Sequence, residues 1–261
     1  MTEQAPVLLE RRGHVAALTL NRPDSRNALS VAMMKQLRQT LAELRTDDSV
    51  WLVTITGAGD KAFCAGADLK ERRNMPEEQV PEVLALIRGV MDDVAALPQP
   101  SLAIINGHAF GGGCEMALSC DLRILASEAM MGLTETSLGI IPGAGGCVRL
   151  PRLVGLAKAK ELILMAKRLT AADSLQVGLV NEIAPAAELN ALGQSYVDAL
   201  LRNGPLALRA AKRAMEGGWD LPDAEARQFE TECYKTIIPT EDRLEALAAF
   251  AEKRAPNFKG C

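Results

Sequence analysis

Two glutamates in this sequence have surroundings that suit acid–base chemistry. Glu115 follows three consecutive glycines and stands in an apolar run with no other charge before Asp121. Apolar surroundings disfavour the charged carboxylate and raise its pKa. A glutamate in the first turn of a helix can also serve that helix end, but Gly112, three residues earlier, is no partner for a capping box. The pattern favours a catalytic role for Glu115.

The second candidate is Glu135, which precedes a loop rich in glycine and proline at 139–146. Taken alone, Glu135 is an ordinary loop carboxylate. Paired with Glu115, it could supply the acid half of an acid–base couple, because two carboxyl groups in different environments can divide the two roles.

Glycines 111–113 follow a predicted strand and open a predicted apolar helix. A helix N-terminus offers unpaired N–H groups and a dipole that favours a negative oxygen, so the segment suits an oxyanion site. A close crossing of helix and strand explains the glycines equally well, and both explanations stay open. The small-residue turn at 62–70 could present another backbone N–H, or it could be only a tight loop.

Strand-like and helix-like segments alternate in the first half of the chain, which predicts the elements that position these residues. Strands are predicted at 15–20, 51–56, 101–106 and 122–126, and helices at 30–45 and 83–97. Such alternation indicates an α/β fold with parallel strands and helices packed outside. Later helices are predicted at 157–167, 188–202, 205–216, 223–234 and 241–253, with only 179–183 extended. We expect an α/β core over residues 1–195 and a helical region over 196–261.

The composition excludes several other classes of protein. The 261 residues are 48% hydrophobic and 24% charged, which is typical of globular chains. A net charge of −4 and 3% aromatic residues argue against a protein devoted to nucleic acid. No apolar run is long enough to span a bilayer, and the first six residues resemble no signal peptide. Six scattered cysteines predict free thiols, hence the cytoplasm or an organelle matrix, and no cluster has metal-ligand spacing.

Three segments together resemble the enoyl-CoA hydratase/isomerase (crotonase) family. They are FCAGADL at 63–69, the run from NG at 106–107 to GGGCE at 111–115, and the stretch from Glu135 to IPGAGG at 141–146. The match begins near NRP at 21–23 and extends to the C-terminal tail. It implies a crotonase (ClpP/crotonase-like) fold of repeated ββα units, with C-terminal helices that build a homotrimer or a dimer of trimers.

The resemblance also implies a reaction and a role for each site residue. The backbone N–H groups of Ala67 and Gly112 would form an oxyanion hole for the thioester oxygen of an acyl-CoA. Glu115 would direct a water to C3, and Glu135 would deliver a proton to C2. Coenzyme A would enter as part of the substrate, with no separate cofactor or metal. Residues implied to contact coenzyme A or the substrate are Arg26, Ala65, Asp68, Leu69, Lys70, Phe250 and Lys253.

For Phe250 and Lys253 the contact could be made in a neighbouring subunit, and plain packing and solvation remain the alternative. Thr134 and Phe110 depart from the residues commonest in the family at these places, and both could reshape the acyl pocket.

The presence of both glutamates favours a hydro-lyase that hydrates a 2-trans-enoyl-CoA. Segments 68–72, 131–136 and 238–245 resemble the methylglutaconyl-CoA hydratase branch, which indicates 3-methylglutaconyl-CoA, with a general short-chain substrate as a close rival. A distal carboxylate on the substrate would require a cation from the protein. Lys70, Arg72 and Arg73 are candidates, and the alternative is that they are only solvated surface charges. A CoA-dependent isomerase is the first alternative. Some members of the branch bind AU-rich RNA, but helix 30–45 has too few basic residues for us to expect that here.

Overall fold

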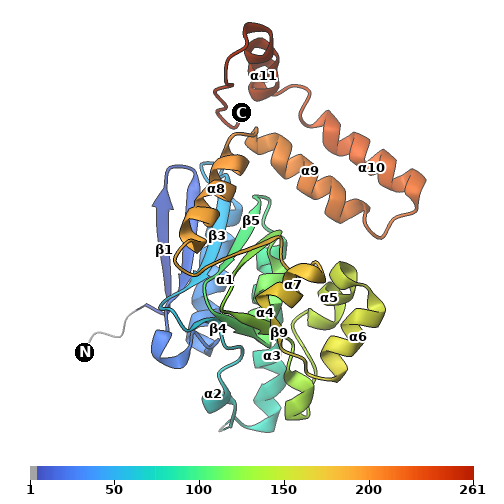
Figure 1. The fold of residues 1–261 in the computed structure, drawn as a ribbon. Coiled ribbons are helices and arrows are strands. Elements are labelled where there is room, and N and C mark those ends of the chain that lie inside the picture. The colour runs from blue at the N-terminus through green and yellow to red at the C-terminus, as the bar shows by residue number, and fades with distance from the viewer. Residues whose placement is uncertain (1–4, 74) are drawn as a thin grey trace.

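The computed structural model describes residues 5–73 and 75–261, and its core contains two β-sheets (Figure 1). The larger sheet has six strands in the order β1-β2-β3-β5-β7-β10. All its neighbours are parallel except β1 and β2, which form an antiparallel pair. Its strands are β1 (Val7–Arg12), β2 (Val15–Leu20), β3 (Leu52–Gly57), β5 (Ser101–Ile105), β7 (Leu122–Ala126) and β10 (Glu182–Ala184).

The smaller sheet is built from short strands that directly follow strands of the larger one. Its order is β4-β6-β8-β9, with β4, β6 and β8 mutually parallel and β9 antiparallel to β8. The strands are β4 (Ala62–Cys64), β6 (His108–Phe110), β8 (Met130–Gly132) and β9 (Leu169–Thr170). The pairs β3-β4, β5-β6 and β7-β8 are each followed by a helix, which confirms the α/β fold of repeated ββα units.

Helices cover the core because their apolar residues lie on one face. The helix α1 (Val31–Arg45) begins where the Ser30 hydroxyl accepts a hydrogen bond from the Met33 N–H, and it buries Leu37, Leu41 and Leu44. It packs against α3 (Val80–Ala95). The remaining helices of this part are η1 (Pro23–Ser25), α2 (Leu69–Arg73), η2 (Glu77–Gln79), α4 (Gly112–Ser119), η3 (Glu135–Leu138), α5 (Gly146–Val154), α6 (Leu156–Leu164) and α7 (Ala171–Gln176).

The C-terminal helices α9 (Pro205–Gly218) and α10 (Asp223–Lys235) form a hairpin that extends away from the sheets, with α11 (Glu241–Glu252) beyond it (Figure 1). By contrast, α8 (Leu189–Leu201) contacts β7, β10, β3 and β5. It is continuous through residue 195, so the helix ends six residues after the boundary that we expected between core and C-terminal region.

The predicted strands and helices are present, with ends displaced by a few residues. The largest difference is at 179–183, where Leu179 and Val180 are buried but only residues 182–184 form a strand. The sequence analysis did not predict the strand β1, the short strands β4, β6, β8 and β9, or the helices α2, α5 (which contains Pro151) and α7. Strands of two or three residues are too short for an alternating pattern.

Several other expectations concern features of the whole chain. The cysteines are free thiols, as predicted. Across residues 5–73 and 75–261, no helix is long and apolar enough to cross a membrane. The same residues hold no group of three or more histidine, cysteine or acidic side chains placed to bind a metal ion. The expectation that the first six residues form no signal peptide concerns residues 1–4, which lie outside the described part.

A buried ion pair fixes α9 to the core. Lys212 is only 6% exposed, and its Nζ lies 2.8 Å from Asp121 Oδ2 and donates to the carbonyl of Gln99 at 3.3 Å. The same carboxylate oxygen accepts hydrogen bonds from the backbone N–H and the hydroxyl of Ser101. The pair therefore joins α9 to the start of β5 and the end of the α4 segment.

We expect Lys212→Met to lower the free energy of unfolding by about 2 to 4 kcal/mol, since it leaves Asp121 with a partly buried, uncompensated charge. Denaturant titration measures the change. The matched control is Lys235→Met, which removes an exposed pair with Glu232 and should cost less than about 1 kcal/mol. Equal stabilities of the two variants would contradict the anchoring role.

Candidate active site

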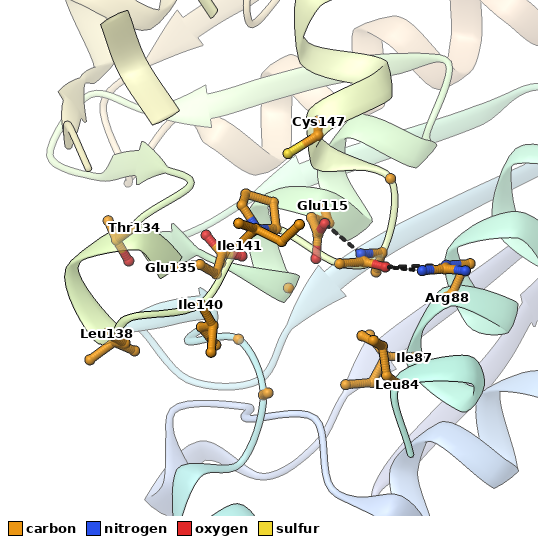
Figure 2. Close-up of a pocket in the computed structure, with 18 of the residues that line it drawn as sticks. Leu84, Ile87, Arg88, Glu115, Thr134, Glu135, Leu138, Ile140, Ile141 and Cys147 are labelled. Atoms are coloured by element: carbon orange, nitrogen blue, oxygen red, sulfur yellow. Dashed lines mark hydrogen bonds between the residues drawn. The ribbon is translucent and has the colours of Figure 1, made fainter. Parts of the chain in front are cut away.

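A cavity of about 900 Å³ lies where the ends of β4, β6 and β8 meet α3 and the start of α5 (Figure 2). It brings together both glutamates, Glu115 and Glu135, which are 20 residues apart in the sequence. The other predicted site residues that line it are Ala65, Ala67, Leu69 and Gly112.

The carboxylate of Glu115 is held by two backbone N–H groups. Glu115 lies in the first turn of α4 and is 3% exposed. Its Oε1 accepts hydrogen bonds from the N–H of Ala144 at 2.8 Å and of Gly146 at 2.9 Å. Burial raises the pKa of Glu115, and these two hydrogen bonds lower it in part. The loop before α5 therefore favours the charged form of a carboxylate that burial disfavours.

Glu135 lies in a different environment at the start of η3. Its Oε2 is buried and has no hydrogen-bond partner among the described residues. Burial raises the pKa of Glu135 to about 7, and the nearby charge of Glu115 adds to the increase. Gly111 has φ +53°, and a Cβ there would lie 3.2 Å from Glu135 Oε1. Glycine at this position therefore leaves the space that the carboxyl group needs.

Two backbone N–H groups point to an oxyanion site beside the glutamates. A Cβ built on Gly112 would lie 3.6 Å from the Ala67 nitrogen, and one built on Gly66 would lie 3.3 Å from the Gly112 nitrogen. The Gly66–Ala67 segment therefore packs directly against Gly112, and Ala67 and Gly112 both line the cavity. In the part of the chain that the structure describes, neither donates a hydrogen bond to another protein group. Gly66, at φ +97°, makes the tight turn that this arrangement requires.

The segment after η1 supports this turn from the side. The Ala65 N–H donates to the Arg26 carbonyl, and the Leu29 N–H donates to the Gly66 carbonyl. Asn27 is fully buried, and its amide donates to the carbonyls of Ala58 and Ala62. Both Arg26 and Asn27 have left-handed backbone conformations, at φ 52° and 55°. Strain of this kind persists only where surrounding contacts impose it, as these hydrogen bonds do.

The remaining predicted contact residues lie elsewhere. Arg26 lines a separate cavity of about 350 Å³, which shares Ala65 with the first. The carboxylate of Asp68 accepts hydrogen bonds from Arg22 at 2.9 Å and from the N–H groups that begin α2. Lys70 lies on the exposed side of α2 and lines neither cavity.

Phe250 and Lys253 are at the end of α11, beyond the hairpin of α9 and α10 and far from the glutamates of the same chain (Figure 1). Phe250 is 86% exposed. Within one chain, these two residues are therefore not brought to the cavity.

Several cavity residues were not found by sequence reasoning. An apolar wall is formed by Leu84 and Ile87 of α3 and by Ile140 and Ile141 of the loop after η3 (Figure 2). The exposed Ile140 and Ile141 were a usable signal, because two adjacent isoleucines in a glycine-rich loop indicate apolar contacts beyond the loop. Arg88 and Arg149, which bind carbonyls of the loop 143–146, gave no signal beyond ordinary helix surface charges.

The environment of Glu135 makes stability depend on pH. Its pKa is raised in the folded protein, so this carboxyl stabilises the fold at low pH and the contribution is lost as pH rises from about 4.5 to about 7. We therefore expect Glu135→Gln to gain stability relative to the parent chain across this window, measured by denaturant titration at a series of pH values.

The control for this measurement is Glu161→Gln. Hydrogen bonds from Lys158 and Lys167 lower the pKa of Glu161 to about 2, so its stability difference from the parent should stay constant between about pH 6 and 8. A Glu135→Gln difference that is equally flat in pH would contradict the raised pKa.

Comparison with known proteins agrees with this geometry. Residues 10–261 match the family model described as enoyl-CoA hydratase/isomerase. The chain is 43% identical over 258 residues to human mitochondrial methylglutaconyl-CoA hydratase, covering 96% of this chain and 75% of the relative. It is 40% identical over 248 residues to the short-chain-enoyl-CoA hydratase of Clostridium acetobutylicum, covering 95% of each.

A solved structure is also similar over nearly the whole chain. The enoyl-CoA hydratase from Bacillus anthracis superimposes with a TM-score of 0.96 at 45% identity, covering 98% of this chain and 100% of that one. The names of these relatives are those of hydratases, which are hydro-lyases, the enzyme class predicted from the sequence. The family match and these identities confirm the predicted fold, and the chain belongs to the enoyl-CoA hydratase/isomerase (crotonase) family.

Proposed function

We propose that this protein is an enoyl-CoA hydratase that adds water across the double bond of a 2-trans-enoyl-CoA. The observation that carries the proposal is the placement of two buried carboxyl groups, Glu115 and Glu135, in a cavity that is also lined by Ala67 and Gly112, whose backbone N–H groups have no partner among the described residues. Water addition needs a base for the water, an acid for the carbon, and donors for the charge that develops on the thioester.

The N–H groups of Ala67 and Gly112 supply those donors. They bind the thioester oxygen. As the π electrons of the C2=C3 double bond shift toward that oxygen, C3 becomes electrophilic. Because these donors are fixed by the backbone, they need no rearrangement as the enolate forms. Removal of one such donor typically costs about 100- to 1000-fold in rate.

The two carboxyl groups divide the proton transfers between them. The Glu115 carboxylate, kept ionised by its two N–H donors, removes a proton from water as the water oxygen bonds to C3. The protonated Glu135, whose pKa is raised to about 7, gives its proton to C2. One water is consumed, one C–O and one C–H bond form, and the two carboxyl groups end with exchanged protonation states. Proton transfer between them through solvent completes the cycle.

A hydratase is favoured over an isomerase because both carboxyl groups are in place. By family resemblance, isomerases generally move a proton with one carboxylate. Here the pKa of each glutamate is raised, and both line the same space. An isomerase would leave one buried carboxyl group without a use at considerable desolvation cost.

For the coenzyme A part we propose a path over Ala65, since this residue lines both the main cavity and the neighbouring cavity with Arg26. No other cofactor is part of the proposal. Phe250 and Lys253 would reach coenzyme A from a second copy of the chain in a homotrimer or a dimer of trimers. Exposed apolar side chains on the C-terminal helices and their connections support such an assembly: Met215, Trp219, Tyr234, Ile238, Leu244, Leu247 and Phe250.

The catalytic roles predict that Glu115→Gln and Glu135→Gln each lower kcat by about 100- to 10,000-fold, since each removes a proton carrier and keeps the side-chain shape. Loss of crotonyl-CoA absorbance measures hydration. Glu161→Gln is the control and should keep full activity, because Glu161 lies on α6, pairs with Lys158 and is not among the residues that line the cavity. If the parent chain hydrates neither crotonyl-CoA nor 3-methylglutaconyl-CoA, the hydratase proposal is wrong and 3-enoyl-CoA isomerisation is the next test.

The finer substrate proposal is 3-methylglutaconyl-CoA. The names of the relatives are mixed, but Arg72 lines the main cavity, whereas the other two candidate cations, Lys70 and Arg73, do not. A guanidinium at the cavity wall suits the distal carboxylate of that substrate, which crotonyl-CoA lacks.

We therefore expect Arg72→Gln to lower kcat/KM for 3-methylglutaconyl-CoA by about tenfold, the loss of about 1.4 kcal/mol. Crotonyl-CoA provides the internal control, because its kcat/KM should change less than about twofold. Arg73→Gln is the matched control variant, since Arg73 is the adjacent arginine on α2 and is not among the cavity residues. An equal loss of kcat/KM for both substrates would indicate that Arg72 contacts a part of the molecule that both substrates share, which would contradict the carboxylate contact.

A further inference from the structure

One peptide unit connects Glu115 to a cation on another helix. The unit between Gly143 and Ala144 donates through its N–H to Glu115 Oε1 at 2.8 Å. The carbonyl of the same unit accepts two hydrogen bonds from Arg88 of α3, from Nε at 3.2 Å and from Nη2 at 3.1 Å. Figure 2 shows the loop between the carboxylate on one side and the guanidinium on the other.

This contact uses two N–H groups of one guanidinium. A guanidinium presents its N–H groups in a rigid planar fork, so two of them on one carbonyl oxygen fix the direction of the peptide plane. The positive charge also polarises the peptide unit and strengthens the N–H as a donor to a carboxylate. A lysine would keep the charge and lose the fork.

The next residue along the loop is tied in a similar way. Arg149 of α5 donates from Nη1 to the Ala144 carbonyl at 3.0 Å, and its Nη2 is 2.9 Å from Asp92 Oδ1 of α3. Arg149 is thus already paired with a carboxylate, whereas Arg88 makes no ion pair with any described residue. Of the two arginines that bind the loop, Arg88 is therefore the one whose charge has no carboxylate partner among the described residues.

Charged and titratable groups of several elements line the cavity with Glu115 or act on it. They are Arg72 from α2, Arg88 and Asp92 from α3, Glu135 from η3, Cys114 from its own helix, and Cys147, Arg149 and Arg152 from α5. Of these, Arg149 and Arg88 lower the pKa of Glu115. Arg88 does not contact the Glu115 carboxylate directly, since the Gly143–Ala144 peptide unit lies between them.

We propose that Arg88 is a positioning residue for Glu115, which it orients and keeps ionised through the Gly143–Ala144 peptide unit. The inference rests on the proposed hydratase function for its kinetic consequences. The effect of Arg88 on the orientation and ionisation of Glu115 does not depend on which reaction the protein catalyses. Arg88 has no proton to exchange in the reaction, so its effect is on the geometry and the charge of the base.

The test compares Arg88→Met and Arg88→Lys with the parent chain. We expect Arg88→Met to lower kcat about tenfold, because one hydrogen bond to a charged group is weakened, with KM changed less than about twofold. The acidic limb of the kcat/KM profile should move to higher pH, because the ionised base is less stabilised. Arg88→Lys should restore the acidic limb in part and kcat only weakly.

The matched control is Arg38→Met, which removes an arginine that is also bound to α3, through Asp93, but has no contact with the loop. It should leave kcat and the pH profile unchanged. A carboxyl titration of Glu115 by carbon-13 NMR in substrate-free protein gives a readout independent of turnover, and Arg88→Met should raise the titration midpoint.

The outcomes separate the two proposals. If the parent chain hydrates no enoyl-CoA but Arg88→Met still raises the Glu115 midpoint, the hydratase proposal fails and the coupling stands. If the midpoint and the acidic limb are both unmoved by Arg88→Met, the positioning role is wrong. An increase in KM alone would likewise overturn it, since that result would make Arg88 a substrate contact.

Discussion

The desolvation of two carboxyl groups in one cavity is the constraint on which the rest of the site depends. An unpaired buried charge is costly, and two like charges in one space are costlier. The structure meets this cost differently at each residue. Glu115 receives two backbone donors from the loop before α5, whereas Glu135 Oε2 has no hydrogen-bond partner among the described residues and the pKa of Glu135 is raised to about 7. The surroundings therefore separate the two groups, since the two donors partly offset the rise in the pKa of Glu115.

This separation requires that distant parts of the chain meet at one place. The loop after β4 provides Ala67, the turn after β6 provides Gly112, and the segment after β8 provides Glu135. These are equivalent positions in three successive ββα units, at the carboxyl ends of parallel strands, where α/β folds commonly place their sites.

Sequence reasoning found the elements with strong periodicity and the residues with conspicuous chemistry. Glu115 was recognisable because a charge in an apolar, glycine-led helix has few structural explanations, and the resemblance strengthened its pairing with Glu135. The helices α1 and α9 were predictable from their amphipathic spacing. Arg88 was not, because its importance lies in a backbone carbonyl 55 residues away, and nothing local marks such a contact. Asp68 is the opposite example. It belongs to a motif that the sequence analysis recognised, but its carboxylate accepts hydrogen bonds from Arg22 and from the start of α2 and does not line the cavity.

The pairing of β4 with β6 contains an irregularity, a shift of register between Ala62 and Cys64. Each residue of a strand advances the chain by about 3.3 Å, which is more than the diameter of an oxygen atom. The register of these two strands therefore sets how the segments that lead to Ala67 and Gly112 lie against each other. In the proposed mechanism, a change in that register would move one backbone donor relative to the other while the core and both carboxyl groups stayed in place. Activity would then depend on the alignment of two three-residue strands as well as on the side chains of the site.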